Sequence, residues 1–172
     1  MCLGCQSDVS HSSVWEKWAI REGGFASPSS QARAQTALNA LQFNSQEVRV
    51  YVLQSPGLTA CAWPDGSVFL TSALVELLEP QEISAVIAHE LGHLRRRPLS
   101  GNASALLGKP PHLDDESRAD EFAAELLHQS GIAPHALAAA LRKVQSTAQL
   151  SDPQRESLAR RANHLDSWVA GE

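Results

Sequence analysis

The chain has 172 residues, 43% of them hydrophobic and 19% charged, and a formal net charge of −5 at pH 7. This length and composition suffice for one buried core, so we expect one main domain. The negative charge argues against a nucleic-acid partner, which needs a basic surface, and no stretch has the roughly 20 apolar residues of a transmembrane helix.

The first residues leave the location of the protein open. Leu3-Gly4-Cys5, followed by a polar spacer, resembles the end of a bacterial lipoprotein signal, whose cysteine carries the lipid. The apolar segment that such a signal needs is absent after Met1. In one interpretation a longer signal precedes Met1 and Cys5 carries a lipid anchor in the cell envelope. In the other, Cys2 and Cys5 are ordinary terminal residues of a soluble, cytoplasmic protein.

Two parts of unequal size are expected. Residues 1–30 form an N-terminal tail with a short helix near residues 14–20, and residues 31–172 form the main domain. Gly23-Gly24 and Ser27-Pro28-Ser29-Ser30 indicate a linker and a helix start. The apolar residues that follow recur at helical spacing and predict an amphipathic helix that ends near Phe43: Ala34, Ala37, Leu38 and Leu41.

Two stretches are typical of β-strands. Residues 48–53 alternate and are rich in β-branched side chains, and residues 67–70 follow the turn signal Pro64-Asp65-Gly66. Between them, residues 59–63 are expected to form an edge strand, to which an extended peptide can add through unpaired N–H and C=O groups. The candidate peptide-binding residues are Ala60, Cys61 and Ala62. The alternative is a short, capped edge without that role.

Residues 80–97 carry the strongest chemical pattern, His89-Glu90-Leu91-Gly92-His93. The apolar residues around it form one stripe of a helix: Ile83, Val86, Ile87, Leu91 and Leu94. His89 and His93 stand one turn apart on an adjacent face, so both imidazoles can reach one metal ion with Glu90 beside them. This is the His-Glu-x-x-His arrangement of zinc peptidases. Gly92 is a poor helix former, and close approach of another segment would explain it.

A third metal ligand is expected on the next predicted helix. A structural zinc site uses four protein ligands, whereas a catalytic site uses three and keeps one position open. The best candidate is Glu116, on a helix over residues 114–127. Asp120 follows one turn later and is expected to accept a hydrogen bond from the outer nitrogen of a ligand histidine. Two further helices are predicted, one opened by Pro134 and one from about Pro153 to Val169.

These motifs carry a family resemblance. His89-Glu90-Leu91-Gly92-His93 followed by Glu116-x-x-Ala119-Asp120 resembles the gluzincin peptidases of the HtpX, CAAX prenyl protease and mitochondrial Oma type. The run from Thr59 to Thr71 is similar to that family's Asn-Ala-Phe-Ala-x-Pro-x-Gly segment, with Thr59 and Cys61 in place of Asn and Phe. The resemblance covers roughly residues 31–144 and implies an α+β, zincin-like metalloprotease domain, mostly helical, with a small sheet next to the metal helix.

The C-terminal part departs from that family. Its members often carry His-Pro followed by an arginine close to the site, but Asp152-Pro153 and Leu158 stand at those positions here. Arg155, Arg160 and His164 are therefore the candidates for a group that donates to the oxyanion of the reaction.

The sequence thus predicts a zinc-dependent endopeptidase that cleaves extended or unfolded polypeptides, in protein quality control as the resemblance implies. One zinc ion per chain is held by His89, His93 and Glu116, and Glu90 is the general base. Two alternatives belong to other classes. In one, the domain binds zinc and polypeptide without turnover, as an assembly module, although such a module needs no Glu90. In the other, the motif is accidental and the chain is a helical structural protein, against which Glu116 and Asp120 argue.

Overall fold

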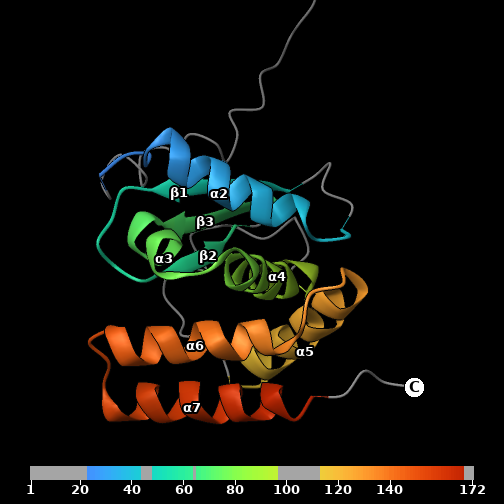
Figure 1. Cartoon of the computed structure of the whole chain (residues 1–172). Coiled ribbons are helices and arrows are strands. Elements are labelled where there is room, and N and C mark those ends of the chain that lie inside the picture. Colours follow the sequence, from blue (N-terminus) through green and yellow to red (C-terminus); the bar gives the residue numbers. More distant parts are fainter. Residues whose placement is uncertain (1–22, 44–47, 64, 97–112, 169–172) are drawn as a thin grey trace, which may run out of the picture.

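A computed structural model describes residues 23–43, 48–63, 65–96 and 113–168 of the chain (Figure 1). Its elements, in chain order, are α2 (Pro28–Asn39), β1 (Arg49–Leu53), β2 (Ala60–Ala62), β3 (Ser67–Thr71), α3 (Ser72–Leu77), α4 (Pro80–Arg96), α5 (Leu113–Gln129), α6 (His135–Thr147) and α7 (Asp152–Asp166). The fold is α+β and mostly helical with one small sheet, as predicted. The short helix near residues 14–20 and the lipoprotein-like start lie outside the described residues.

The three strands form one sheet in the order β1-β3-β2. β1 pairs in parallel with β3, and β2 pairs antiparallel with the other side of β3. All five residues of the central strand β3 are buried. A turn leads from β2 into β3, in which the Gly66 N–H donates to the Trp63 carbonyl at 3.0 Å and Gly66 adopts a φ of 85°. In this strand order, β2, which the sequence predicted at residues 59–63, is an edge strand of the sheet.

Helices cover one face of the sheet, and further helices pack beneath them (Figure 1). The apolar face of α2 packs with Val50 and Val52 of β1 and with the stripe of α4 in one core. α6 and α7 run side by side on the far side of α4 from the sheet. The opposite face of the sheet carries a separate cluster of large side chains: Tyr51, Leu53, Cys61, Trp63 and Phe69.

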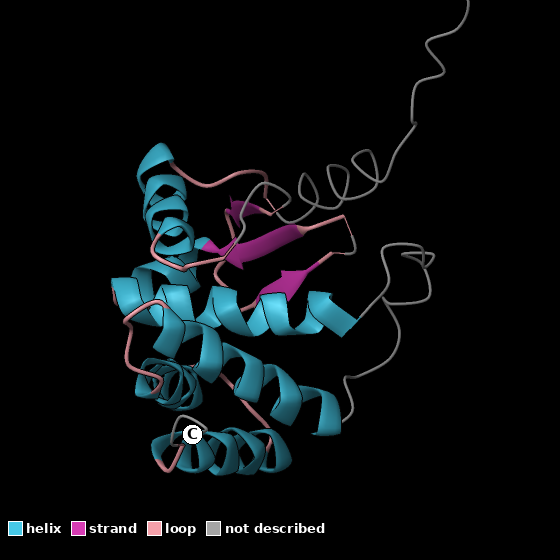
Figure 2. Ribbon diagram, turned by 90° about the vertical axis from the view of Figure 1, so that its right-hand side faces the viewer, coloured by secondary structure: helices cyan, strands magenta, loops and turns pink. Residues whose placement is uncertain are grey.

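The start of α4 is fastened by a buried carboxylate. Glu82 accepts a hydrogen bond from the Glu79 N–H at 2.7 Å, which satisfies one of the free donors at the helix N-terminus. The same carboxylate forms an ion pair with Lys143 of α6 at 2.7 Å. The helix thus begins at a fixed place relative to α6. It then runs beside the edge strand β2, and α5 crosses it on its other side (Figure 2).

Gly92 lies where α4 and α5 touch. A Cβ atom at this position would stand 2.9 Å from the Cα and 3.1 Å from the carbonyl oxygen of Ala119 on α5. Both are backbone atoms, so no side-chain rotation can relieve the clash. The close approach that the sequence predicted at Gly92 is present, and only glycine allows the two helices to pack at this distance.

We predict that Gly92→Ala destabilises the protein, although alanine is the better helix former by about 1 kcal/mol. Forcing α5 away from α4 costs typically 1–3 kcal/mol for an overpacked core, which exceeds the gain in helix propensity. Urea unfolding measures the difference. Gln81→Ala, at an exposed position of the same helix, is the matched control. A more stable Gly92→Ala variant would contradict the described packing of the two helices.

Candidate metal centre

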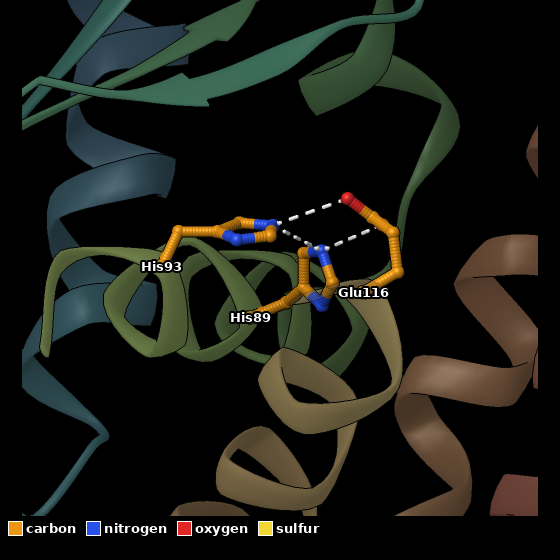
Figure 3. Close-up of side chains that lie close together, drawn as sticks. All are labelled: His89, His93 and Glu116. Atoms are coloured by element: carbon orange, nitrogen blue, oxygen red, sulfur yellow. Dashed lines mark hydrogen bonds and ion pairs between the residues drawn. The ribbon is translucent and has the colours of Figure 1, made fainter. Parts of the chain in front are cut away.

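α4 places two imidazoles on one face, one turn apart. The Nε2 atoms of His89 and His93 lie 3.1 Å apart, and the two rings stand nearly perpendicular, at 88° (Figure 3). The His89 side chain is 9% exposed and that of His93 is 19% exposed. Two ring nitrogens that face each other at this distance, on side chains largely shielded from solvent, can bind the same metal ion.

α5 brings a carboxylate to the same point. Glu116 Oε2 lies 3.4 Å from His89 Nε2, and Glu116 Oε1 lies 3.4 Å from His93 Nε2. Zinc bonds of about 2.0–2.1 Å in a tetrahedral site require ligand atoms roughly 3.3 Å apart. The three side chains therefore fit a zinc ion, and they are the group of possible metal ligands found among the described residues (Figure 3).

Asp120 orients one of the imidazoles. Its side chain is 2% exposed, and its Oδ1 lies 2.9 Å from His89 Nδ1. A carboxylate at this distance accepts the Nδ1–H hydrogen bond and so fixes the tautomer in which Nε2 carries the free lone pair. Glu116 and Asp120 are one turn apart on α5, and both point at α4. The structure thus places Asp120 beside the outer nitrogen of His89, where the sequence predicted it.

α7 adds a cation that the sequence analysis did not single out. Arg161 donates to both oxygens of Asp120, from Nε to Oδ2 and from Nη2 to Oδ1, each at 2.7 Å. Its Nη1 lies 2.6 Å from Glu116 Oε2. Leu158, at the position of the family's usual arginine, precedes Arg161 by three residues and shares its helix face. That spacing was a signal available in the sequence.

The three residues predicted as candidate donors to the oxyanion do not lie at the metal centre. Arg155 donates to the carbonyl of Gln145, Arg160 pairs with Glu156 at 3.8 Å, and His164 is exposed. None of these side chains contacts the His89, His93 and Glu116 group in the described structure. The basic residue of α7 at the site is Arg161.

Glu90 is close enough to the metal group and to the edge strand β2 for its charge to act on both. It is buried, and among the described residues no side chain donates a hydrogen bond to its carboxylate. Its negative charge is near enough to β2 to raise the pKa of Cys61, which burial raises first, to about 12. The Cys61 thiol is therefore protonated at neutral pH.

The outer edge of β2 offers two residues for backbone pairing. Thr59 accepts from the Thr71 N–H at 3.1 Å, and the Trp63 N–H donates to Ser67 at 2.8 Å, so these positions face β3. Successive residues of a strand point their backbone groups in opposite directions. Ala60 and Ala62 consequently direct their N–H and C=O groups away from β3, and no described strand pairs with them. Cys61 faces inward.

Residues 27–111 match the sequence model of Peptidase family M48. The chain belongs to peptidase family M48. Within the matched segment lie the three strands and α4 with His89, Glu90 and His93, whereas Glu116, Asp120 and Arg161 lie beyond it. The members of this family are metallopeptidases and are in general zinc-dependent. As a peptidase, this M48 protein acts on polypeptides.

Two kinds of relative resemble this M48 peptidase. Metalloprotease LoiP of Escherichia coli strain K12 is 25% identical over 174 aligned positions, which cover 77% of this chain and 68% of that protein. The Protease HtpX homolog of Helicobacter pylori strain Shi470 is 40% identical over 57 residues, 31% of this chain and 18% of the relative. The homolog of Helicobacter acinonychis strain Sheeba gives the same values. None of the helices in the described part of this chain has the length and apolar character needed to cross a bilayer.

The charges of the M48 site depend on one another. Burial alone lowers the pKa of His89, but hydrogen bonds to Asp120 and Glu116 and the charge of Glu90 raise it to about 9. Burial raises the pKa of Glu116, yet both histidines and Arg161 hold it well below its usual range. Glu116 is thus an anion at neutral pH, as a metal ligand must be. The pKa of Glu90 is raised, mainly by burial.

We predict different losses from the two carboxylates of α5. Glu116→Ala should lose the metal outright, whereas Asp120→Ala should weaken zinc affinity by about 10- to 100-fold, because an outer partner orients a ligand without being one. Equilibrium dialysis followed by metal analysis measures both. Glu121→Ala, exposed on the same helix, should bind like wild type. Equally complete loss in the Asp120 variant would make Asp120 a direct ligand and reverse the assignment.

Proposed function

We propose that the protein is a zinc-dependent endopeptidase of the His-Glu-x-x-His, gluzincin type, with His89, His93 and Glu116 as the ligands of one zinc ion. The observation that carries the proposal is the convergence of two imidazole nitrogens and one carboxylate at mutual distances of 3.1–3.4 Å. Three protein ligands leave a fourth position open, which is typical of catalytic zinc sites.

The chemistry follows from the charges of the site. Zinc, when bound, polarises a peptide carbonyl and lowers the pKa of its water to about 7. Glu90 directly follows His89 in the sequence and has a raised pKa, and its carboxylate has no protein donor among the described residues. It takes a proton from the attacking water and passes it to the amine that leaves as the C–N bond breaks.

We further propose that the substrate is an extended polypeptide segment that pairs with β2. Ala60 and Ala62 point their backbone groups outward, and β2 runs beside α4, which carries the three motif residues. Main-chain hydrogen bonds accept any side chain, whereas segments within a folded protein already have partners. Unfolded or frayed chains are therefore the proposed substrates, and protein quality control is the proposed role.

We predict that Glu90→Gln retains about one zinc per chain while peptide hydrolysis falls by at least the 10²- to 10⁴-fold that general-base catalysis supplies. Glutamine keeps the volume and leaves all three ligands in place. Glu125→Gln, an exposed change on α5, is the control. Undiminished cleavage by Glu90→Gln would remove Glu90 from the mechanism. Binding of unfolded polypeptide without any cleavage by wild type would instead support a silent binding module.

We also predict that the enzyme cleaves casein, an unfolded protein, and spares an equal mass of a tightly folded one. Ala62→Pro removes one outward N–H without breaking β2–β3 pairing, and proline is tolerated at such edge positions. Loss of one hydrogen bond of about 1 kcal/mol should lower kcat/KM for a long peptide roughly 5-fold. Ala62→Val, which keeps the N–H, controls for the side chain. Equal cleavage of folded and unfolded protein, or equal activity of both Ala62 variants, would contradict edge pairing.

A further inference from the structure

One side chain of α7 is directed into the metal centre. Arg161 is 15% exposed and reaches α5 across 41 residues of sequence, where it contacts Glu116 and Asp120. Its neighbour Arg160 is 65% exposed and pairs with Glu156 of its own helix. Two adjacent arginines thus have opposite surroundings, and only Arg161 meets the site.

The contacts of Arg161 match the shape of a guanidinium group. Nε and Nη2 donate hydrogen bonds to the two oxygens of Asp120 in a bidentate pair, and Nη1 forms an ion pair with one oxygen of Glu116. The planar fork of arginine fixes the angle between such donors, which an ammonium group cannot do. All three nitrogens are engaged with carboxylates, and Nη2 also lies 3.5 Å from Nδ1 and 3.4 Å from Nε2 of His89. The shortest contacts of the side chain, at 2.6–2.7 Å, are those with Asp120 and Glu116.

Each carboxylate gains a defined orientation from this contact. Glu116 and Asp120 are like charges one turn apart on a helix, an arrangement that is unfavourable without a cation between them. Because Glu116 Oε2 accepts from Arg161, Oε1 remains for a metal and faces His93 Nε2 at 3.4 Å. Because Asp120 is held at both oxygens, its Oδ1 stays 2.9 Å from His89 Nδ1. A carboxylate ligand and a histidine ligand are thus both aligned by one residue.

We propose that Arg161 is a positioning residue of the metal centre, which sets the orientation of Glu116 and, through Asp120, of His89, and which makes α7 a required part of the site. The inference rests on the proposed function, in which Glu116 and His89 are zinc ligands. Arg161 itself is not one of the three proposed ligands. Its removal leaves every ligand present but leaves two carboxylates and one imidazole without a common alignment.

The test measures zinc affinity by competition with a chromophoric chelator in the full chain. Arg161→Ala should weaken zinc binding by about 10- to 100-fold, as the loss of outer partners of metal ligands does. Arg161→Lys keeps the charge and most of the stem but not the fork, and should remain several-fold weaker than wild type. The visible absorption of the cobalt-loaded protein should shift in both variants, because it reports ligand geometry.

Two controls separate positioning from helix docking. Arg160→Ala removes an adjacent exposed cation. Arg142→Ala removes the α6 side chain that contacts Asn163 and Asp166 of α7 and so loosens the docking of α7 away from the site. Both should bind zinc as wild type does.

The outcomes are distinguishable. Wild-type zinc affinity and an unshifted cobalt spectrum in Arg161→Ala would overturn this inference and leave the proposed function standing. Full zinc affinity in Arg161→Lys would do the same. The lysine variant decides the question where the alanine variant does not fold. Equal weakening by Arg142→Ala would assign the effect to docking of α7 and overturn it as well. Failure of the wild type to bind zinc would overturn the proposed function together with this inference.

Discussion

The close contact of α4 and α5 at Gly92 is the constraint on which the site depends. The histidines come from one helix and the carboxylates from the other, and all four groups lie within one helical turn of that contact. A Cβ at position 92 would meet the Ala119 backbone at 2.9 Å, so the distance between the helices is set by the absence of a side chain. With the helices farther apart, Glu116 would not reach the two nitrogens, which it approaches to 3.4 Å.

Charge balance is the second condition of this arrangement. Burying carboxylates is unfavourable unless they are paired and fully hydrogen-bonded, and Asp120 is 2% exposed. Arg161 supplies the counter-charge from α7, a helix that α6 holds in place. Removing one partner of such a network is strongly destabilising, because it leaves another buried charge unpaired. The C-terminal helices are thereby linked to the motif on α4, although the family match ends before them.

Local periodicity explains what the sequence could predict. The stripe of α4 and the spacing of His89 and His93 lie within one helix, and the turn signal before Ser67 located β3 and its neighbouring edge. Glu116 followed from the need for a third ligand on the next helix. The spacing from Leu158 was compatible with Arg161 but did not single it out, because Arg155 lies three residues from Leu158 as well and the contacts with α5 depend on how α7 packs. The outward direction of Ala60 and Ala62 likewise depends on the hydrogen bonds of Thr59 and Trp63, which the residue pattern does not specify.

The central claim is that one zinc ion is held by His89, His93 and Glu116. The most direct measurement is a crystal structure of the zinc-loaded protein with anomalous scattering recorded at the zinc absorption edge. The account predicts one strong peak at about 2.0–2.1 Å from both Nε2 atoms and from an oxygen of Glu116. A peak bound to other side chains, or zinc-loaded protein in which Glu116 is not a ligand, would contradict it.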